Sequence, residues 1–372
     1  MIYLDYTADT PVDERVLQKF TETVREQFAN PNSTHSEGRV AKAVIDNALS
    51  DIAKLLGIQP NELIFTSGAS EANNLAVKGL AFTNRRKGKH IISTFLEHSS
   101  VSGALTFLQE QGYEIDLVNI LPDGKVDLDN LRNLMRPDTI LCAVCAVDSE
   151  LGTIQPTAAI AEILKDHPDC RLHIDATQAI GKMPFSFAGA DTVSFAPHKF
   201  YGLKGCGVLY KRGGCVLEPL IHGGASTTIY RSGTPDTSAI AALSTALGIA
   251  VNEQQERYDY VKTLNDRVRA ELTKMPKVRI NSPADAVPHI LNISVDGIKG
   301  EEMRKLLDER GICVSVKSAC SVPNTPSRPV FAVSHDRKNA LSSWRLSLSH
   351  LTTEYELEVF LEALEHIIRE NS

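Results

Sequence analysis

Short runs rich in β-branched and aromatic residues alternate with helical patterns between about residue 60 and residue 212. Such alternation is typical of a mainly parallel sheet that is covered by helices on both faces. The sequence therefore predicts an α/β fold with a mainly parallel, seven-stranded sheet. The seven runs are "ELIFTSG", "HIISTF", "EIDLVNI", "TILCAVCAV", "RLHID", "TVSFAP" and "GVLYKR".

The chain of 372 residues is longer than one hydrophobic core usually supports, which favours two domains. A helix is expected over residues 41–56, with Gly57 as its stop signal. After about residue 250 the sequence changes to charged helices with a few strands, and Thr353 and Glu356 form a capping box for the last helix. We expect a large α/β domain over residues 12–253 and a smaller α+β domain made of residues 1–11 and 254–372.

Composition excludes several classes of protein. With 42% hydrophobic and 23% charged residues, the chain has the composition of a globular protein, and its net charge of −7 argues against a nucleic-acid-binding surface. The N-terminus lacks the features of a signal peptide and no apolar stretch is long enough to span a bilayer, so we expect a cytoplasmic protein. Seven cysteines suit reduced thiols, and Cys142 and Cys145 lie in an apolar run that favours core packing over a metal or redox site.

Polar residues follow three of the predicted strands. The turn "TSGAS", with Ala69 and Ser70, opens a helix and can present backbone amides to a phosphate, although many such turns bind nothing. Asp175 ends a second strand, where it is equally well explained as a helix cap, and Lys199 follows a third. A partly desolvated lysine can react with an aldehyde. Together the anion site, the acid and the amine predict a site for pyridoxal 5'-phosphate.

Many ordered motifs resemble those of one family, the cysteine desulfurases of the class V aminotransferase group, which are fold-type I pyridoxal phosphate enzymes. The resemblance covers nearly the whole chain. The matching stretches are "YLDYTADTPVD", "NPNSTHSEGR", "FTSGASEANNLA", "EHSSV", "ELGTIQP", "HIDATQAIGK", "HKFYGLKG", "LIHGG", "RSGTPD", "SACS" and "SSWRLSLS".

The resemblance implies roles for residues that would otherwise be read as ordinary polar surface or cap residues. His98 would stack on the pyridine ring and help to move protons, while Gln178 would bind the phenolic oxygen of the cofactor. His198 would hold the phosphate together with the Ala69–Ser70 turn. Asp175 would keep the ring nitrogen protonated, and Lys199 would carry the aldehyde carbon.

The same resemblance implies a substrate, a dimer and a sulfur acceptor. Arg345 would bind the carboxylate of the substrate cysteine, and Thr234 would reach the phosphate of the neighbouring subunit in a homodimer. Cys320 would be the nucleophile that becomes a persulfide and passes sulfur to an acceptor protein, with Lys317 nearby favouring its thiolate. The Pro, Ser and Asn residues around Cys320 suggest a mobile loop.

Four positions depart from the family pattern: Asp9, Asp148, Ser149 and Ala196. The family has Asn at Asp148, where it would contact the cofactor oxygen and the substrate carboxylate. An ionised carboxylate can only accept hydrogen bonds, so Asp148 is expected to alter substrate choice or turnover, or to pair with Arg345. The missing hydroxyl at Ala196 removes one phosphate contact.

The sequence leaves two alternatives beside a cysteine desulfurase that supplies sulfur for iron-sulfur clusters or thiolated products. One is another pyridoxal phosphate α,β-lyase, such as a selenocysteine or cystine lyase. The other is a catalytically weakened homologue that acts as a scaffold or regulator.

Overall fold

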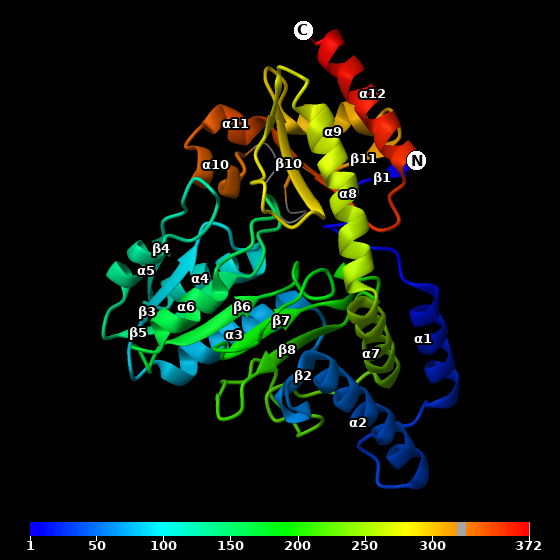
Figure 1. Cartoon of the computed structure of the whole chain (residues 1–372). Helices are drawn as coiled ribbons and strands as arrows, with labels where there is room; N and C mark the ends of the chain where they lie inside the picture. Colours follow the sequence, from blue (N-terminus) through cyan, green and yellow to red (C-terminus); the bar gives the residue numbers. More distant parts are fainter. Residues whose placement is uncertain (318–324, 372) are drawn as a thin grey trace.

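The large sheet has the strand order β2–β8–β7–β6–β5–β3–β4 in the computed structural model, which describes residues 1–317 and 325–371. β8 runs in the direction opposite to the other six strands of this sheet. The prediction of a mainly parallel, seven-stranded sheet is confirmed (Figure 1). Its strands are β2 (Leu63–Thr66), β3 (His90–Thr94), β4 (Glu114–Val118), β5 (Thr139–Cys145), β6 (Arg171–Asp175), β7 (Thr192–Phe195) and β8 (Gly207–Lys211).

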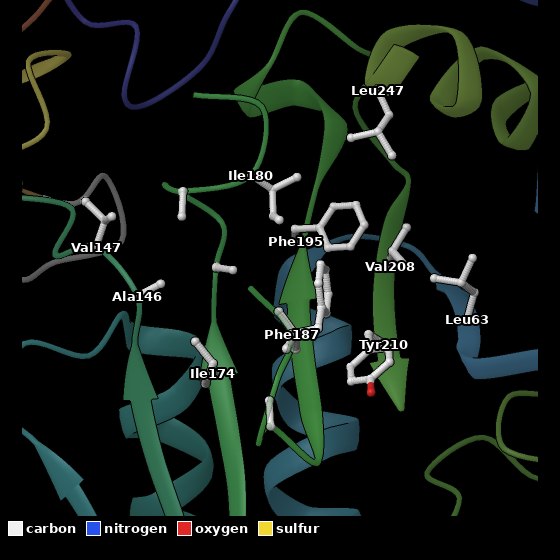
Figure 2. Close-up of a cluster of buried hydrophobic side chains, with 14 of the residues drawn as sticks. Leu63, Ala146, Val147, Ile174, Ile180, Phe187, Phe195, Val208, Tyr210 and Leu247 are labelled. Carbon is white, nitrogen blue, oxygen red and sulfur yellow. The ribbon is translucent and has the colours of Figure 1, made fainter. Parts of the chain in front are cut away.

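Helices cover both faces of this sheet. Successive side chains of a strand point to opposite faces, so a strand with apolar residues throughout needs a packing partner on each face. On β8, Val208 and Tyr210 join one hydrophobic cluster while Leu209 joins another. Figure 2 shows Phe195 and Val208 packed together in the first cluster. That cluster receives α1 (Glu14–Glu26), α2 (Ser36–Leu56), α5 (Leu128–Leu134), α6 (Thr157–Leu164) and α7 (Thr237–Asn252), and the second receives α3 (Ala69–Asn84) and α4 (Ser99–Glu110).

Local signals in the sequence match the structure closely. Helix α2 ends at Leu56, and Gly57 takes the left-handed conformation (φ 69°) that lets a chain leave a helix. Cys142 and Cys145 lie buried in β5, as the apolar run predicts. No helix in the described part of the chain is long and apolar enough to cross a membrane.

The C-terminal part of the chain has its own core, which also takes in Leu4 near the N-terminus. Trp344 is fully buried there with its ring edge against Phe360. Thr353 and Glu356 form the predicted capping box of the last helix. The domain boundaries at 11/12 and 253/254 stay a prediction. The elements are β1 (Ile2–Tyr3), paired with β11 (Ile312–Cys313); an antiparallel sheet of β9 (Val278–Ile280), β10 (Ile290–Val295) and β12 (Ser343–Ser347); and α8 (Gln254–Leu272), α9 (Gly300–Asp308), α10 (Arg328–Ser334), α11 (Arg337–Ser342) and α12 (Glu354–Glu370).

The fold brings the chemically important residues to one edge of the large sheet. Parallel strands end at a common edge, so the segments that follow β3, β6 and β7 lie near one another. Asp175 is the last residue of β6, His98 and Lys199 lie in the segments after β3 and β7, and the turn after β2 leads there into α3.

Candidate active site

A cavity of about 380 Å³ lies at this edge of the sheet. Its wall also includes residues of the N-terminal segment and of β12, so distant parts of the chain close it. Eight of the residues predicted from the sequence line the cavity: Ala69, Ser70, His98, Asp175, Gln178, His198, Lys199 and Arg345.

Lys199 ends a short 3₁₀ turn, Pro197–Lys199, directly after β7. Its Nζ donates to the carbonyl oxygens of Thr7 (2.9 Å) and Ala8 (2.6 Å). Burial, helped by the charge of Arg345, lowers the pKa of Lys199 to about 8. This amine is therefore deprotonated more readily than that of an ordinary lysine, which is what reaction with an aldehyde requires.

Asp175 lines the cavity, and the alternative of a helix cap is wrong, because a turn and not a helix follows β6. Its Oδ1 accepts from the backbone N–H of Thr177 in that turn (3.0 Å). Its Oδ2 accepts from Asn73 Nδ2 (2.8 Å), and Asn73 Oδ1 contacts His173 Nε2 (3.0 Å). This buried network fixes the carboxylate at the cavity wall.

Asn73 is a site residue that sequence reasoning missed. It is fully buried in α3 and joins Asp175 to Ser100 and Ser194. The available signal was an asparagine on the same helical face as Ala72 and Ala76, both of which are buried. Buried amides are nearly always hydrogen-bonded, so such a position points to a polar network.

His98 is the N-cap residue of α4, and its Nδ1 accepts from the backbone N–H of Ser100 (3.2 Å). A backbone N–H can only donate, so the neutral ring carries its proton on Nε2. Burial lowers the pKa of His98, which keeps the ring neutral near pH 7. A neutral imidazole suits both stacking and proton transfer.

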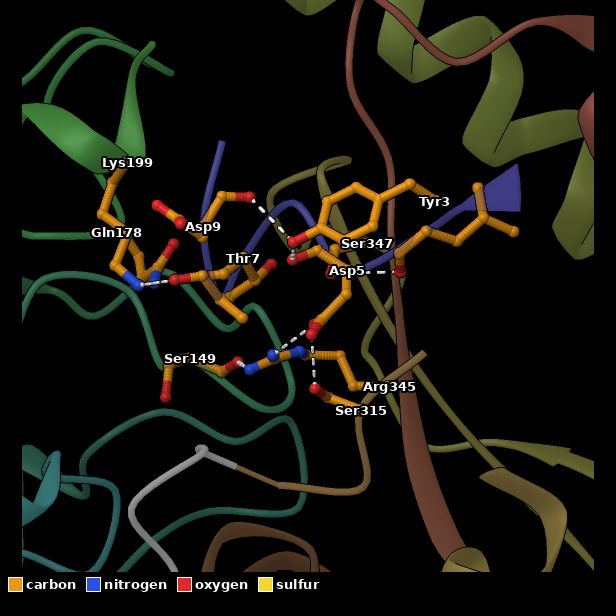
Figure 3. A network of polar contacts seen from close by, with 12 residues as sticks. Tyr3, Asp5, Thr7, Asp9, Ser149, Gln178, Lys199, Ser315, Arg345 and Ser347 are labelled. Carbon is orange, nitrogen blue, oxygen red and sulfur yellow. Dashed lines mark hydrogen bonds and ion pairs between the residues drawn. The ribbon is translucent and has the colours of Figure 1, made fainter. Parts of the chain in front are cut away.

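Arg345 connects three segments of the chain at the cavity wall (Figure 3). Its Nη2 lies 2.9 Å from Asp5 Oδ1, and its Nη1 donates to the carbonyl oxygen of Ser149 (2.8 Å). The side chain is only 2% exposed, and its Nε has no hydrogen-bond partner within the described residues. The guanidinium thus retains unused donors inside the cavity wall.

Asp148 lies outside the cavity lining, although its neighbour Ser149 belongs to it. The expected ion pair with Arg345 is wrong: among the described residues Arg345 pairs with Asp5. Asp148 Oδ2 instead accepts the backbone N–H groups of Glu150 (3.1 Å) and Leu151, which holds the turn after β5. Burial raises the pKa of Asp148 to about 7, so much of this carboxyl is protonated near neutral pH.

Thr234 and Ala196 are not part of the cavity lining. Thr234 is exposed on the segment before α7 and is absent from the lining. Ala196 is fully buried between β7 and Pro197. Cys320 lies outside the described residues.

Glu97, next to His98, is a second residue that sequence reasoning missed. Its Oε1 accepts from Thr94 Oγ1 (2.8 Å) and from the backbone N–H of Cys145 (2.9 Å), while Oε2 is buried without a partner among the described residues. Burial, with the nearby charges of Asp175 and Asp148, raises the pKa of Glu97 from 4.5 to about 8. The Glu97 carboxyl is therefore mostly protonated at neutral pH.

We expect Glu97→Gln to remove a pH dependence of stability. Between pH 4.5 and 8 the native protein keeps a proton that the unfolded chain releases, so this group makes the wild type less stable as the pH rises. The loss across that window is on the order of 4 kcal/mol, and the amide variant should not show it. Urea unfolding at pH 5 and pH 8 measures the difference. The exposed control Glu110→Gln should follow the wild type; equal pH slopes for wild type and Glu97→Gln would show that Glu97 ionises normally.

The donor set of the cavity fits pyridoxal phosphate. A helix N-terminus with Ser70 and His198 suits a phosphate, a buried carboxylate suits a protonated ring nitrogen, and a lysine of lowered pKa suits an aldehyde. Gly68, the N-cap residue of α3, makes no side-chain cap that would cover these amides. All these groups line one cavity.

Comparisons with known proteins agree with this reading. The "Cysteine desulfurase IscS" of Dictyoglomus turgidum is 37% identical over 372 residues, which cover 99% of this chain and 94% of that protein. The protein of the same name from Methanosarcina thermophila is also 37% identical, with 99% and 92% covered. A solved structure of a "NifS-like protein" superposes with a TM-score of 0.93 at 34% identity and covers 99% of both chains. A structure titled "SspA in complex with cysteine" superposes with a TM-score of 0.83 at 31% identity, covering 95% of this chain and all of that one.

The family model described as "Aminotransferase class-V" matches residues 2–360. That range contains every residue that lines the cavity. The resemblance seen in the sequence motifs is confirmed, and the chain belongs to the aminotransferase class V family.

Proposed function

We propose that this protein is a pyridoxal-phosphate-dependent cysteine desulfurase that converts L-cysteine to L-alanine and passes the sulfur to an acceptor protein. The observation that carries the proposal is the meeting of Lys199, Asp175, the N-terminus of α3 and Arg345 in one cavity. The names of the curated relatives support this activity over the lyase and scaffold alternatives.

The cofactor would be held by groups that the cavity already presents. Ala69, Ser70 and His198 would bind the phosphate, Gln178 the phenolic oxygen and Asp175 the ring nitrogen. When bound, pyridoxal phosphate withdraws electrons from the α-carbon of an amino acid. The chain contributes the fixed charge of Asp175, which needs no reorganisation because Asn73 already orients it.

Arg345 would bind the substrate carboxylate. Two of its five N–H groups are used by Asp5 and Ser149, and the buried Nε–H has no partner among the described residues. A carboxylate is the group that a guanidinium binds best, through paired hydrogen bonds. Lys199, whose lowered pKa favours the free amine, would take the α-proton once the substrate is in place.

Cys320 would accept the sulfur. Its thiolate attacks the substrate sulfur, the bond from sulfur to the β-carbon breaks, and the β-carbon gains a proton. Lys199 then returns a proton to the α-carbon, which leaves alanine and a persulfide on Cys320. An acceptor protein then takes this sulfur for iron-sulfur clusters or thiolated products. A reducing, cytoplasmic location suits a thiol that must be regenerated after every turnover.

Product analysis with the purified holoenzyme tests the proposal. Incubated with L-cysteine and a reductant, the protein should release sulfide and alanine in equal amounts. L-Selenocysteine, L-cystine and D-cysteine serve as competitors in parallel reactions. A faster reaction with any of them, or pyruvate in place of alanine, would overturn the assignment.

A homodimer is the assembly that the surface supports best. Phe28 and Ile229 are 84% and 71% exposed, and large apolar side chains at such exposure suit burial by a partner. Their segments are neighbours, since Asn32 Nδ2 donates to Ser226 Oγ (3.2 Å). Thr234 lies exposed a few residues beyond Ile229, where a second subunit could receive it.

We expect Thr234→Ala to lower cofactor affinity about 10- to 100-fold, the usual cost of one hydrogen bond to a charged group. A mixed dimer of Lys199→Ala and Thr234→Ala subunits, isolated with two affinity tags, locates the effect. If Thr234 serves the neighbouring subunit, this dimer holds one wild-type site and recovers about half of the wild-type activity at limiting cofactor. Recovery no better than that of the Thr234→Ala dimer would mean that Thr234 serves its own subunit or none.

A further inference from the structure

A second, smaller chamber lies behind Lys199. It has a volume of about 20 Å³, enough for one water molecule or one small ion. Lys199 and Thr7 line both this chamber and the active-site cavity. Its lining also includes Thr10, Lys182, Arg257 and His289.

Within the described residues, the lining of this chamber includes Lys182, Lys199 and Arg257 and no carboxylate. Lys182 is only 8% exposed, and its Nζ donates to Gln178 Oε1 with no carboxylate paired to it among the described residues. Arg257 is similarly buried and pairs with Glu253, which lies outside the lining. Burial of an ammonium without a counter-ion is costly. Accordingly, burial lowers the pKa of Lys182 well below its usual range, with the charges of Lys199 and Arg345 adding to the effect.

Three buried polar atoms around the chamber have no partner within the described chain: Arg257 Nε, whose N–H can only donate, and Thr7 Oγ1 and His289 Nδ1, which can donate or accept. The main acceptor, the carbonyl oxygen of Thr7, already receives Lys199 Nζ (2.9 Å) and Gln178 Nε2 (3.2 Å), and Figure 3 shows Gln178 and Lys199 meeting at Thr7. Another acceptor, Thr10 Oγ1, receives the backbone N–H of Tyr201 (2.8 Å).

We propose that this chamber binds a monovalent anion of the size of chloride, held by Lys182, Arg257 and His289. The lining holds the buried cations Lys182 and Arg257 and no carboxylate within the described residues, so an anion supplies a negative charge that a water molecule cannot, and it also accepts from the unpaired Arg257 Nε–H. The anion balances the charge of Lys182, which then stays an ammonium and donates to Gln178 Oε1. Because Gln178 lines the active-site cavity, the bound anion also fixes the direction of that amide.

Bromide is the direct probe, because its anomalous scattering identifies it. Crystals of the holoenzyme grown in sodium bromide should show an anomalous peak between Lys182 and His289. In solution, the midpoint of thermal unfolding should rise by roughly 2 °C per tenfold increase in chloride above its dissociation constant. Sodium gluconate keeps the ionic strength constant, and gluconate is too large for the chamber.

Matched variants separate this site from general salt effects. Lys182→Met should lose the chloride response, while Lys42→Met, which removes an exposed lysine paired with Asp46 on α2, should keep it. Absence of a bromide peak in the wild type would overturn the proposal and assign the chamber to water beside a neutral Lys182. An undiminished chloride response in Lys182→Met would overturn it as well. The bromide result decides the matter even if Lys182→Met fails to fold.

Discussion

Replacement of Lys199 by alanine is expected to lower the rate of cysteine turnover by at least about 10⁴-fold. The change removes the only amine that lines the active-site cavity within the described residues, and with it the base that takes the α-proton. Positioned general bases alone contribute about 10²- to 10⁴-fold, and loss of covalent attachment adds to that. Sulfide release under saturating L-cysteine measures the effect.

The matched control is Lys204→Ala. Lys204 lies five residues further along the chain, is exposed, and pairs with Asp9 at the surface. Its removal changes the net charge as Lys199→Ala does but should leave turnover close to that of the wild type. Thermal unfolding shows whether both variants are folded. We expect Lys199→Ala to fold, because the Thr7 carbonyl oxygen still accepts from Gln178 when Lys199 is lost.

Borohydride reduction gives a second readout that does not depend on activity. Reduction of the wild-type holoenzyme should leave the cofactor covalently attached to the peptide that contains Lys199. Lys182, the neighbouring buried lysine, lines only the smaller chamber and should remain unlabelled. Attachment to Lys182, or substantial turnover by Lys199→Ala, would show that another amine carries the chemistry.

Most of the fold could be predicted from the sequence because its signals are local. Strand runs, the Gly57 stop signal and the Thr353 capping box each depend on a few neighbouring residues, and each has its expected counterpart in the structure. The antiparallel direction of β8 was not specified. Only residues 196–206 separate it from β7, and they form a 3₁₀ turn and a loop, without the crossover helix that a parallel strand would need.

The site was predictable where residues follow strand ends and not where partners come from distant segments. Asp175 and Lys199 could be placed because parallel strands end at one edge. Asn73 reaches Asp175 across 102 positions, and Asp5 reaches Arg345 across 340. The chemistry of Asp148 suggested a pair with Arg345, but the backbone amides of its own turn satisfy one of its oxygens instead. Charge alone does not say which of two carboxylates the fold brings to an arginine.

Arg345→Lys is expected to raise the KM for L-cysteine about 100-fold or more while cofactor binding stays intact. Lysine keeps the charge but carries its three N–H donors on one nitrogen, so it cannot present the planar pair of donors that a carboxylate matches and also reach Asp5 and Ser149. Steady-state kinetics give the KM, and the visible absorption of the holoenzyme reports on the cofactor. A raised KM with an unchanged kcat would indicate that Arg345 binds the substrate carboxylate equally strongly in the ground state and in the transition state.

Asp5→Asn separates substrate binding from the structural role of Arg345. Asp5 accepts from Ser315 Oγ (2.7 Å) as well as from Arg345, so both variants disturb the same junction between the N-terminal segment and β12. Only Arg345→Lys removes the guanidinium. If the arginine binds substrate, Asp5→Asn should leave the KM within a fewfold of the wild type, because freeing the guanidinium from its internal carboxylate leaves more of it for the substrate. If the two variants instead raise the KM equally and lose stability equally, then Arg345 serves to join the segments, and the substrate carboxylate must find its positive charge elsewhere in the cavity.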